Sequence, residues 1–248
     1  MKSGVFEMNC EKLSHRLEAV ASYIPKDSRL ADIGSDHAYL PCYAVKKGLV
    51  PFAIAGEVVL GPFQSAKRQV ELESLTGQID VRKGDGLEVI ERGEIDCITI
   101  AGMGGALIAS ILEAGQEKLE LTSRLILQPN ISAITVRNWL LNNGWELMAE
   151  HILEEDNKIY EILVAEKGQP RKPYKNLPKE LLLGPFLMAE RSNTFTKKWL
   201  AEVENWRRVL RQVENALETE DNKQKKLELN EKIQMVEEVL NVEKGEWL

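Results

Sequence analysis

The residues best suited to chemistry stand near the start of the chain, in the stretch R-L-A-D-I-G-S-D-H-A-Y-L-P at residues 29–41. Its apolar first part predicts the end of a buried strand, and Gly34 permits a sharp turn with close approach to a ligand. A dinucleotide-binding G-x-G-x-x-G turn would carry glycines where Asp36 and Tyr39 stand. An acidic side chain there would repel a pyrophosphate but attract the sulfonium and ammonium groups of S-adenosylmethionine. The turn therefore favours methyl transfer over hydride transfer, with an ordinary strand–helix turn as the alternative.

Three later segments place polar residues or glycines where predicted strands end. Glu57 lies near the end of the strand predicted over 52–59, about 20 residues beyond the glycine turn, where a carboxylate can accept from both ribose hydroxyls of an adenosyl group. Asp85 stands between two glycines after a strand predicted at 79–81, where it could reach an adenine amino group or simply form a turn. G-M-G-G at 102–105 follows a buried strand and indicates backbone packed against a ligand or a flat base.

Strands and helices alternate along the first two thirds of the chain. Five strand–helix units are predicted, and a β-hairpin with a tight turn at Asp156-Asn157 follows them. Alternation predicts a parallel sheet with helices on both faces. A terminal hairpin that adds an antiparallel strand is the topology of the Rossmann-like methyltransferases, whereas dinucleotide dehydrogenase domains continue with a parallel strand. The predicted strands cover residues 30–33, 52–59, 79–81, 95–101, 124–128, 145–153 and 158–164.

A helix is predicted over residues 11–24, just before the first strand, from its apolar stripe and from Pro25 behind it. This helix could cap the ligand cleft. Arg16 and His15 lie on its polar side, so they face either the cleft or solvent.

The composition changes after residue 167, which divides the chain into a predicted methyltransferase domain at 1–167 and a C-terminal part at 168–248. Residues 168–178 are rich in Pro, Lys and Arg and predict a linker. Apolar residues at 4-3-4 spacing then predict an antiparallel helical hairpin with a coiled-coil seam. The seam runs from Trp199 to Leu217 and from Leu229 to Leu240, with a polar turn at 218–224.

Charge is unevenly distributed along the chain. The net charge is −7, yet residues 166–215 carry 11 Lys/Arg and 6 Asp/Glu, a local net charge of +5. A basic block inside an acidic chain suits either a nucleic-acid partner or a solvated helix face. The side chains predicted to contact phosphates are Lys197, Lys198, Arg207, Arg208 and Arg211.

The composition also argues against other classes of protein. No run of about 18 apolar residues exists, so no membrane span is expected. The N-terminus has no signal-peptide core, so a cytoplasmic location is expected. Cys10, Cys42 and Cys97 form no C-x-x-C motif, and the three histidines are scattered, so reduced thiols and no metal site are expected.

Taken as a set, the motifs resemble the bacterial TrmK family. They are L-S-x-R-L, D-I-G-S-D-H-A-Y-L-P, A-G-E-V, G-P-F-x-S-A, G-D-G-L, I-A-G-M-G-G and L-Q-P-N, between Leu13 and Lys167, and the helical hairpin follows as in that family. The resemblance implies transfer of a methyl group from S-adenosylmethionine to N1 of adenine-22 in the D-arm of tRNA. A monomer is expected. Two other classes stay open, a dehydrogenase and a non-catalytic RNA-binding module with a decayed cofactor site.

The expected roles follow from this chemistry. Adenine N1 is already a nucleophile, so its attack on the sulfonium methyl needs alignment more than a base. Expected cofactor-binding residues are Arg16, Asp32, Gly34, Ser35, Asp36, His37, Glu57, Asp85, Gly86, Ala101, Gly102 and Met103. Residues expected at the reacting base are Asp36, His37, Tyr39, Met103, Gly104 and Asn130.

Overall fold

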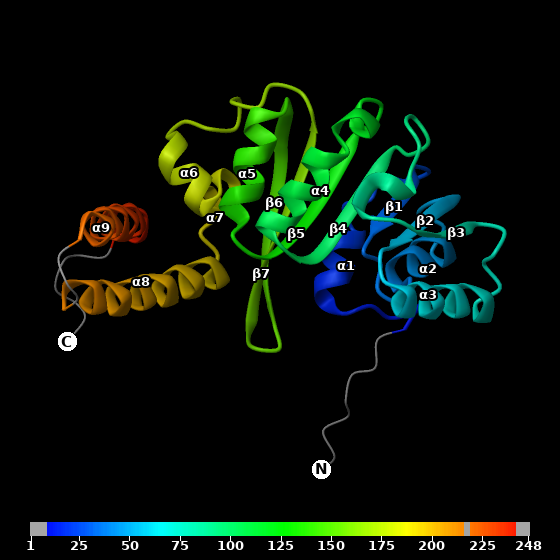
Figure 1. Ribbon diagram of the computed structural model, residues 1–248, viewed down its shortest axis with the longest axis horizontal. Helices are drawn as coiled ribbons and strands as arrows, with labels where there is room; N and C mark the ends of the chain where they lie inside the picture. The colour runs from blue at the N-terminus through cyan, green and yellow to red at the C-terminus, as the bar shows by residue number, and fades with distance from the viewer. Residues whose placement is uncertain (1–8, 216–218, 242–248) are drawn as a thin grey trace, which may run out of the picture. The chain divides into compact units, whose positions relative to one another are not determined.

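The computed structural model describes residues 9–215 and 219–241, and these form two compact units that divide between Pro173 and Tyr174. The first unit is a seven-stranded sheet with helices around it (Figure 1). The strands are β1 Arg29–Ile33, β2 Phe52–Glu57, β3 Ile79–Lys83, β4 Cys97–Gly104, β5 Arg124–Ile131, β6 Trp145–Glu155 and β7 Lys158–Lys167.

The sheet order is β3-β2-β1-β4-β5-β7-β6, and every neighbouring pair from β3 to β5 is parallel. Strand β7 runs antiparallel to both of its neighbours, β5 and β6. The hairpin therefore inserts its second strand next to β5 and leaves β6 at the edge. The predicted sheet with one antiparallel hairpin strand is confirmed, and the carboxyl ends of β1, β4 and β5 meet at its centre.

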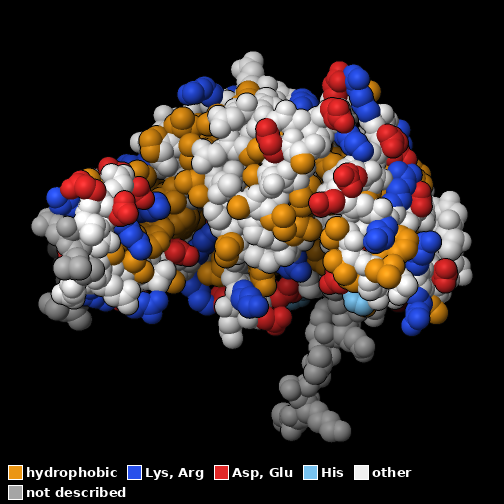
Figure 2. Space-filling view, viewed as in Figure 1, with side chains coloured by type: hydrophobic (Ala, Val, Ile, Leu, Met, Phe, Trp, Pro, Cys, Tyr) orange, Lys and Arg blue, Asp and Glu red, His pale blue; other side chains and the backbone are white. Residues whose placement is uncertain are grey.

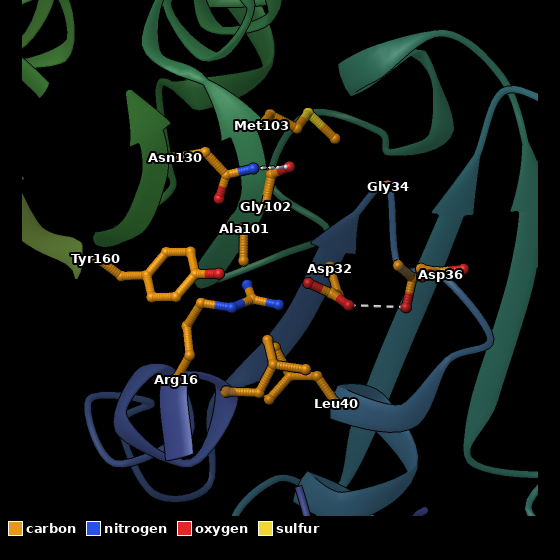
Figure 3. A pocket seen from close by; sticks show the side chains of 12 residues that line it. Arg16, Asp32, Gly34, Asp36, Leu40, Ala101, Gly102, Met103, Asn130 and Tyr160 are labelled. Carbon is orange, nitrogen blue, oxygen red and sulfur yellow. Dashed lines mark hydrogen bonds between the residues drawn. The ribbon is translucent and has the colours of Figure 1, made fainter. Parts of the chain in front are cut away.

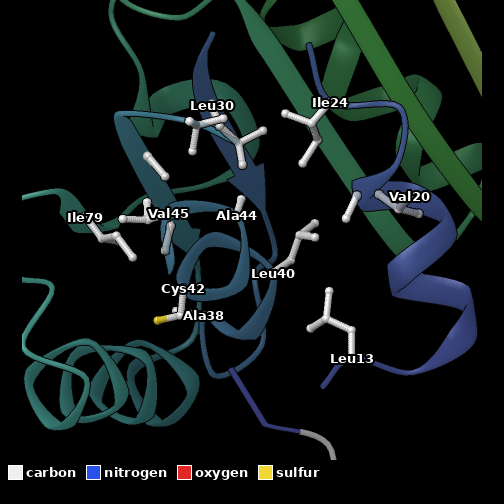
Figure 4. Packing of buried hydrophobic residues seen from close by; sticks show 14 of the residues in the cluster. Leu13, Val20, Ile24, Leu30, Ala38, Leu40, Cys42, Ala44, Val45 and Ile79 are labelled. Atoms are coloured by element: carbon white, nitrogen blue, oxygen red, sulfur yellow. The ribbon is translucent and has the colours of Figure 1, made fainter. Parts of the chain in front are cut away.

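Helices cover both faces of this sheet. Helices α1, α2 and α3 share one apolar cluster with the strands, in which Leu13, Leu30 and Leu40 are almost completely buried (Figure 4). Helices α4 and α5 pack against each other on the opposite face (Figure 1). The bounds are α1 His15–Ala21, α2 Tyr39–Lys46, α3 Leu60–Leu72, α4 Gly105–Ala114 and α5 Ala133–Asn142, with short 3-10 turns η1 Gly86–Val89 and η2 Gln116–Leu119.

One buried ion cluster joins α5 to the hairpin. The fully buried guanidinium of Arg137 donates to Glu150 at 2.6 Å and to Glu161 at 2.5 Å. Removing a single partner from such a cluster leaves a buried charge uncompensated. The cluster therefore fixes where the antiparallel hairpin sits against α5.

Some element boundaries differ from the sequence-based prediction. Helix α1 starts at His15, because the Ser14 hydroxyl caps it by accepting from the Leu17 amide, and Leu13 is buried ahead of it. Strand β4 continues through Gly104 instead of ending at the predicted residue 101, and Gly105 begins α4. The predicted linker at 168–178 is too long, since α6 starts at Leu177 with a proline in its first turn.

The second unit is helical, as predicted. It contains α6 Leu177–Leu183, α7 Pro185–Glu190, α8 Asn193–Glu214 and α9 Glu220–Leu240. Figure 1 shows α9 nearly along its axis while α8 lies across the view, so the two helices cross. Accordingly Trp199 and Val203 of the predicted seam are buried, whereas Trp206 and Leu210 are half-buried. The predicted seam residue Leu217 and the first residue of the predicted turn at 218–224 lie outside the described residues.

None of the helices that the structure describes combines the length and apolar character needed to cross a bilayer.

Candidate functional site

A pocket of about 290 Å³ opens at the carboxyl ends of β1, β4 and β5, with α1 beside it (Figure 3). This is where open α/β sheets bind their ligands. Leu17, Leu40 and Tyr160 line the pocket and had not been predicted. Predicted residues that line it are Arg16, Asp32, Gly34, Ser35, Asp36, Ala101, Gly102, Met103 and Asn130.

The Asp32 carboxylate is the acidic centre of the pocket. It is 4% exposed and accepts from the Thr99 hydroxyl at 2.6 Å and from the Ser35 hydroxyl at 2.7 Å. Burial raises the pKa of Asp32 despite these hydrogen bonds and the nearby Arg16. A buried carboxylate in this state is stabilised by any cation that enters the pocket. Thr99 was missed because a threonine inside a predicted strand is ordinary β sequence.

Glu57 lies just behind the pocket wall. Its carboxylate accepts from the Asp36 backbone N–H at 2.5 Å and is almost completely buried, although it does not line the pocket. Burial raises the pKa of Glu57, and the carboxylates of Asp32 and Asp36 raise it further. Three carboxylates thus gather where β1 and β2 end.

The turn after β1 has an unusual backbone. Asp36, His37 and Ala38 have consecutive positive φ angles of 39°, 62° and 55°. Residues other than glycine adopt this backbone conformation only at a cost in free energy. Gly34 has φ +71°, and a Cβ added there would lie 2.2 Å from Met103 Cε. The positive φ therefore favours glycine at this turn, and a larger residue would also displace the flexible end of the Met103 side chain.

A cation faces these carboxylates across the pocket. Figure 3 shows the Arg16 guanidinium between the Tyr160 ring and the Asp32 carboxylate. Arg16 donates from Nη1 to Gln128 Oε1 at 2.5 Å and lies 5.3 Å from the Tyr160 ring centroid. Arg16 thus belongs to the cleft, whereas His15 is exposed. Tyr160 carries no signal in the sequence, because only the insertion of β7 beside β5 brings it here.

Two amide side chains hold the start of the glycine run. The Gly102 N–H donates to Gln128 Oε1 at 2.9 Å, and the Gly102 carbonyl accepts from Asn130 Nδ2 at 2.7 Å. Gln128 Nε2 also donates to Asn130 Oδ1 at 3.2 Å. The motif L-Q-P-N marked this strand end, yet only Asn130 had been predicted as a functional residue.

Several predicted residues lie outside the pocket. His37 and Tyr39 stack on each other with ring centroids 5.5 Å apart, next to Asp36. A Cβ on Gly104 would have Ile131 Cγ1 at 3.9 Å as its nearest neighbour. Asp85 and Gly86 line a second hollow of about 450 Å³ together with residues of α4.

The predicted phosphate contacts all lie on α8, in the second unit. Arg207 donates to Glu237 at 2.7 Å, Arg208 donates to Asn205 at 2.7 Å, and Arg211 lies 3.7 Å from Glu204. Lys198 Nζ lies 5.0 Å from the Trp199 ring centroid, and Lys197 is exposed. Figure 2 shows Lys and Arg mixed with Asp and Glu over α8 and α9 on the face in view.

In the part of the chain that the structure describes, no group of three or more His, Cys, Asp or Glu side chains could hold a metal ion.

Comparison with known proteins assigns the chain to a family. A family model described as tRNA (adenine(22)-N(1))-methyltransferase, TrmK, matches residues 30–238. The tRNA (adenine(22)-N(1))-methyltransferase of Bacillus subtilis is 54% identical over 94% of this chain and 99% of its own. The crystal structure of B. subtilis TrmK superposes with a TM-score of 0.89 and 53% identity, covering 93% of this chain and 99% of that one.

Ligand-bound structures are also similar. The Streptococcus pneumoniae Sp1610 protein, a putative tRNA (m1A22) methyltransferase in complex with S-adenosyl-L-methionine, is 45% identical with a TM-score of 0.82 and covers 92% of this chain and 100% of its own. Mycoplasma capricolum TrmK in complex with S-adenosyl-homocysteine is 29% identical with a TM-score of 0.79, covering 94% and 99%. The family expected from the motifs is confirmed: this chain belongs to the TrmK family of tRNA (adenine(22)-N(1))-methyltransferases.

Proposed function

We propose that this chain transfers the methyl group of S-adenosylmethionine to N1 of adenine-22 in tRNA, with the reaction centred on the pocket of Figure 3. The observation that carries the proposal is the pairing of one guanidinium, Arg16, with the carboxylates of Asp32 and Asp36 around a pocket at the carboxyl edge of the family's sheet. S-adenosylmethionine carries a carboxylate that suits Arg16, and sulfonium and ammonium groups that suit the carboxylates of Asp32 and Asp36. The residues present therefore fit this cofactor.

The cofactor contacts divide by chemistry. Arg16 binds the methionine carboxylate, while Asp32, Asp36 and Ser35 bind the cationic end, and Gly34 lets the backbone approach. Glu57 accepts from the ribose hydroxyls. Asp85 and Gly86, at the end of β3, take the adenine, and the glycine run with Ala101, Gly102 and Met103 lines the other side. Glu57 ends β2 and Asp85 follows the neighbouring parallel strand β3, which supports their sharing one ligand.

The target base lies against Asn130 and Met103 of the pocket and against neighbouring residues outside it. The His37–Tyr39 stack, next to Asp36, offers an aromatic surface, Asn130 offers an amide, and Gly104 leaves room for a flat ring. A base inside a helix stem must leave its stack to reach such a pocket.

Positioning is the main catalytic contribution of these residues. The N1 lone pair lies in the plane of the ring and needs no deprotonation, so the ring must only be held in line with the methyl group. Attack forms the N1–methyl bond as the sulfur–methyl bond breaks, and the adenine ring becomes cationic. The carboxylates of Asp32 and Asp36 are the groups that stabilise that charge.

The helical unit, with the linker before it, binds the tRNA backbone. Its support is the basic composition of residues 166–215 and the exposure of Arg208, Arg211 and Lys197. Arg207 is committed in part to Glu237 and contributes less. The enzyme acts as a monomer in the cytoplasm, a setting in which the free thiols of its cysteines stay reduced.

The decisive experiment is methylation of a tRNA transcript with adenine or guanine at position 22. Transfer to N1 of the adenine transcript alone supports the proposal. Binding of both transcripts without transfer would instead indicate a non-catalytic RNA-binding protein.

The role of α8 is tested separately. Arg208→Glu with Arg211→Glu should lower the dependence of log affinity on log salt, because two phosphate contacts are lost. Lys26→Glu with Lys47→Glu, at two exposed residues of the first unit that precede β1 and β2, changes net charge equally and should leave that slope unchanged. Equal slopes for both variants would remove α8 from the RNA-binding surface.

A further inference from the structure

The orientation of the Gln128 side chain is fixed by its partners. Gln128 is fully buried, and its Oε1 accepts from Arg16 Nη1 at 2.5 Å and from the Gly102 N–H at 2.9 Å. A guanidinium and a backbone N–H can only donate, so the oxygen of Gln128 must point at them. Its Nε2 is thereby directed at Asn130 Oδ1, 3.2 Å away.

The Asn130 amide is consequently held from both ends. Its Oδ1 accepts from Gln128, and its Nδ2 donates to the Gly102 carbonyl at 2.7 Å, a group that can only accept (Figure 3). Each atom keeps one further hydrogen-bonding position, a second lone pair on Oδ1 and a second hydrogen on Nδ2. Asn130 is exposed and lines the pocket. The chain therefore presents one acceptor and one donor, side by side and in fixed order, to whatever enters.

This order matches one edge of adenine. The Hoogsteen edge offers the N6 amino group as a donor beside N7 as an acceptor, and an asparagine amide pairs with both. The Watson–Crick edge includes N1, which must stay free to attack the methyl group. Guanine offers two acceptors, O6 and N7, so a fixed amide satisfies only one of them.

We propose that Asn130 reads N6 and N7 of the target adenine, leaving N1 free, and that Gln128 is the positioning residue that fixes the amide of Asn130 for this purpose. The inference rests on the proposed function, because it deepens the assignment of Asn130 to the base. Since Gln128 also binds Arg16, one buried side chain joins the cofactor end of the pocket to the base end.

The test removes N7 from the substrate. Transcripts carrying adenine or 7-deazaadenine at position 22 are compared by kcat/KM with the wild type, Asn130→Ala and Gln128→Leu. The ratio of kcat/KM for the adenine transcript to kcat/KM for the 7-deazaadenine transcript should be about tenfold larger for the wild type than for Asn130→Ala. A factor of this size is expected for the loss of one of the two hydrogen bonds of a bidentate pair. Gln128→Leu should lose the same discrimination, although Gln128 does not touch the base. Removing N7 also alters the intrinsic reactivity of N1, but that change is common to all variants and cancels between them.

Two controls separate positioning from loss of structure. Gln78→Leu, on the exposed turn before β3, makes the same substitution away from the pocket and should discriminate like the wild type. Gln128→Glu keeps both bonds to Oε1 but places an oxygen against Asn130 Oδ1, so it should lose the discrimination while still binding S-adenosylmethionine in calorimetry. If Gln128→Leu does not fold, Gln128→Glu alone tests the positioning role of Gln128.

The outcomes are distinct. Equal discrimination by the wild type and Asn130→Ala overturns the reading of N7. Discrimination that is lost in Asn130→Ala but kept in the Gln128 variants overturns the positioning role. A wild-type enzyme that fails to methylate the natural transcript contradicts the proposed function itself, which is a separate result.

Discussion

Gly104, the last residue of β4, and Gly105, the first residue of α4, should respond to substitution in opposite ways. Gly104 has φ −71° and ψ 145°, which any residue adopts, and a Cβ there meets no atom closer than 3.9 Å. Gly104→Val should therefore reduce the free energy of unfolding by less than about 1 kcal/mol. A Cβ on Gly105 would lie 2.2 Å from the Ser132 carbonyl oxygen and 2.9 Å from its carbon. Backbone must then move, so Gly105→Ala should cost about 1–3 kcal/mol.

The order of the two glycines should be reversed for methylation activity, so that Gly104→Val is the more damaging substitution. The two γ-carbons of a valine at 104 would occupy the space through which the proposed base approaches, and they would displace a flat ring by more than about 1 Å. A displacement of that size costs about 100-fold in rate. Gly104→Val should thus be folded and nearly inactive. His37→Ala and Asp36→Asn should keep measurable rates, because N1 needs no deprotonation and neither side chain is required as a base.

Two measurements check this pair. Denaturant unfolding gives the stability of each glycine variant, and single-turnover methylation at saturating tRNA and cofactor gives the rate across about pH 5.5 to 9. A flat pH profile for the wild type, with residual rates in both polar variants, supports positioning. Near wild-type turnover by Gly104→Val would show that the ring approaches elsewhere. A rate that rises tenfold per pH unit and disappears in Asp36→Asn would mean that a general base exists.

Three further predictions concern binding and stability. Glu57→Ala should weaken S-adenosylmethionine binding by about 1–3 kcal/mol in calorimetry, and unchanged affinity in the folded variant would remove Glu57 from the ribose site. Burial raises the pKa of Asp32 and Glu57, so these groups take up protons at a higher pH than ordinary carboxylates, and cofactor affinity should decrease as pH falls, with proton release on binding. The unliganded protein should instead lose stability as pH rises above the ordinary carboxyl pKa values of 3.8 and 4.5, and an affinity independent of pH would contradict the cause. Arg137→Met should lower the free energy of unfolding by about 3–5 kcal/mol, against about 1 kcal/mol or less for Arg29→Met, which breaks the exposed pair with Asp96.

Local features of the chain were predictable because their causes lie within a few residues. The buried strand that ends at Ile33, the glycine turn at Gly34 and the alternation of strands and helices all follow from local patterns. Parallel strands joined by helices bring their carboxyl ends to one edge, so the sequence predicts a shared site for Asp32, Gly102 and Asn130. The sequence by itself thus determined the fold class, the family and the central residues of the pocket.

Tertiary structure decided the contacts that depend on pairing between distant segments. Tyr160 meets Arg16 because β7 inserts beside β5, and a hairpin pattern alone does not say which of its strands does so. Gln128 and Thr99 have the composition of ordinary buried strand residues, and only their positions relative to Gly102 and Asp32 show that their polar atoms are used. Spacing along a chain fixes which face a side chain takes, whereas its partners are fixed by strand order and register.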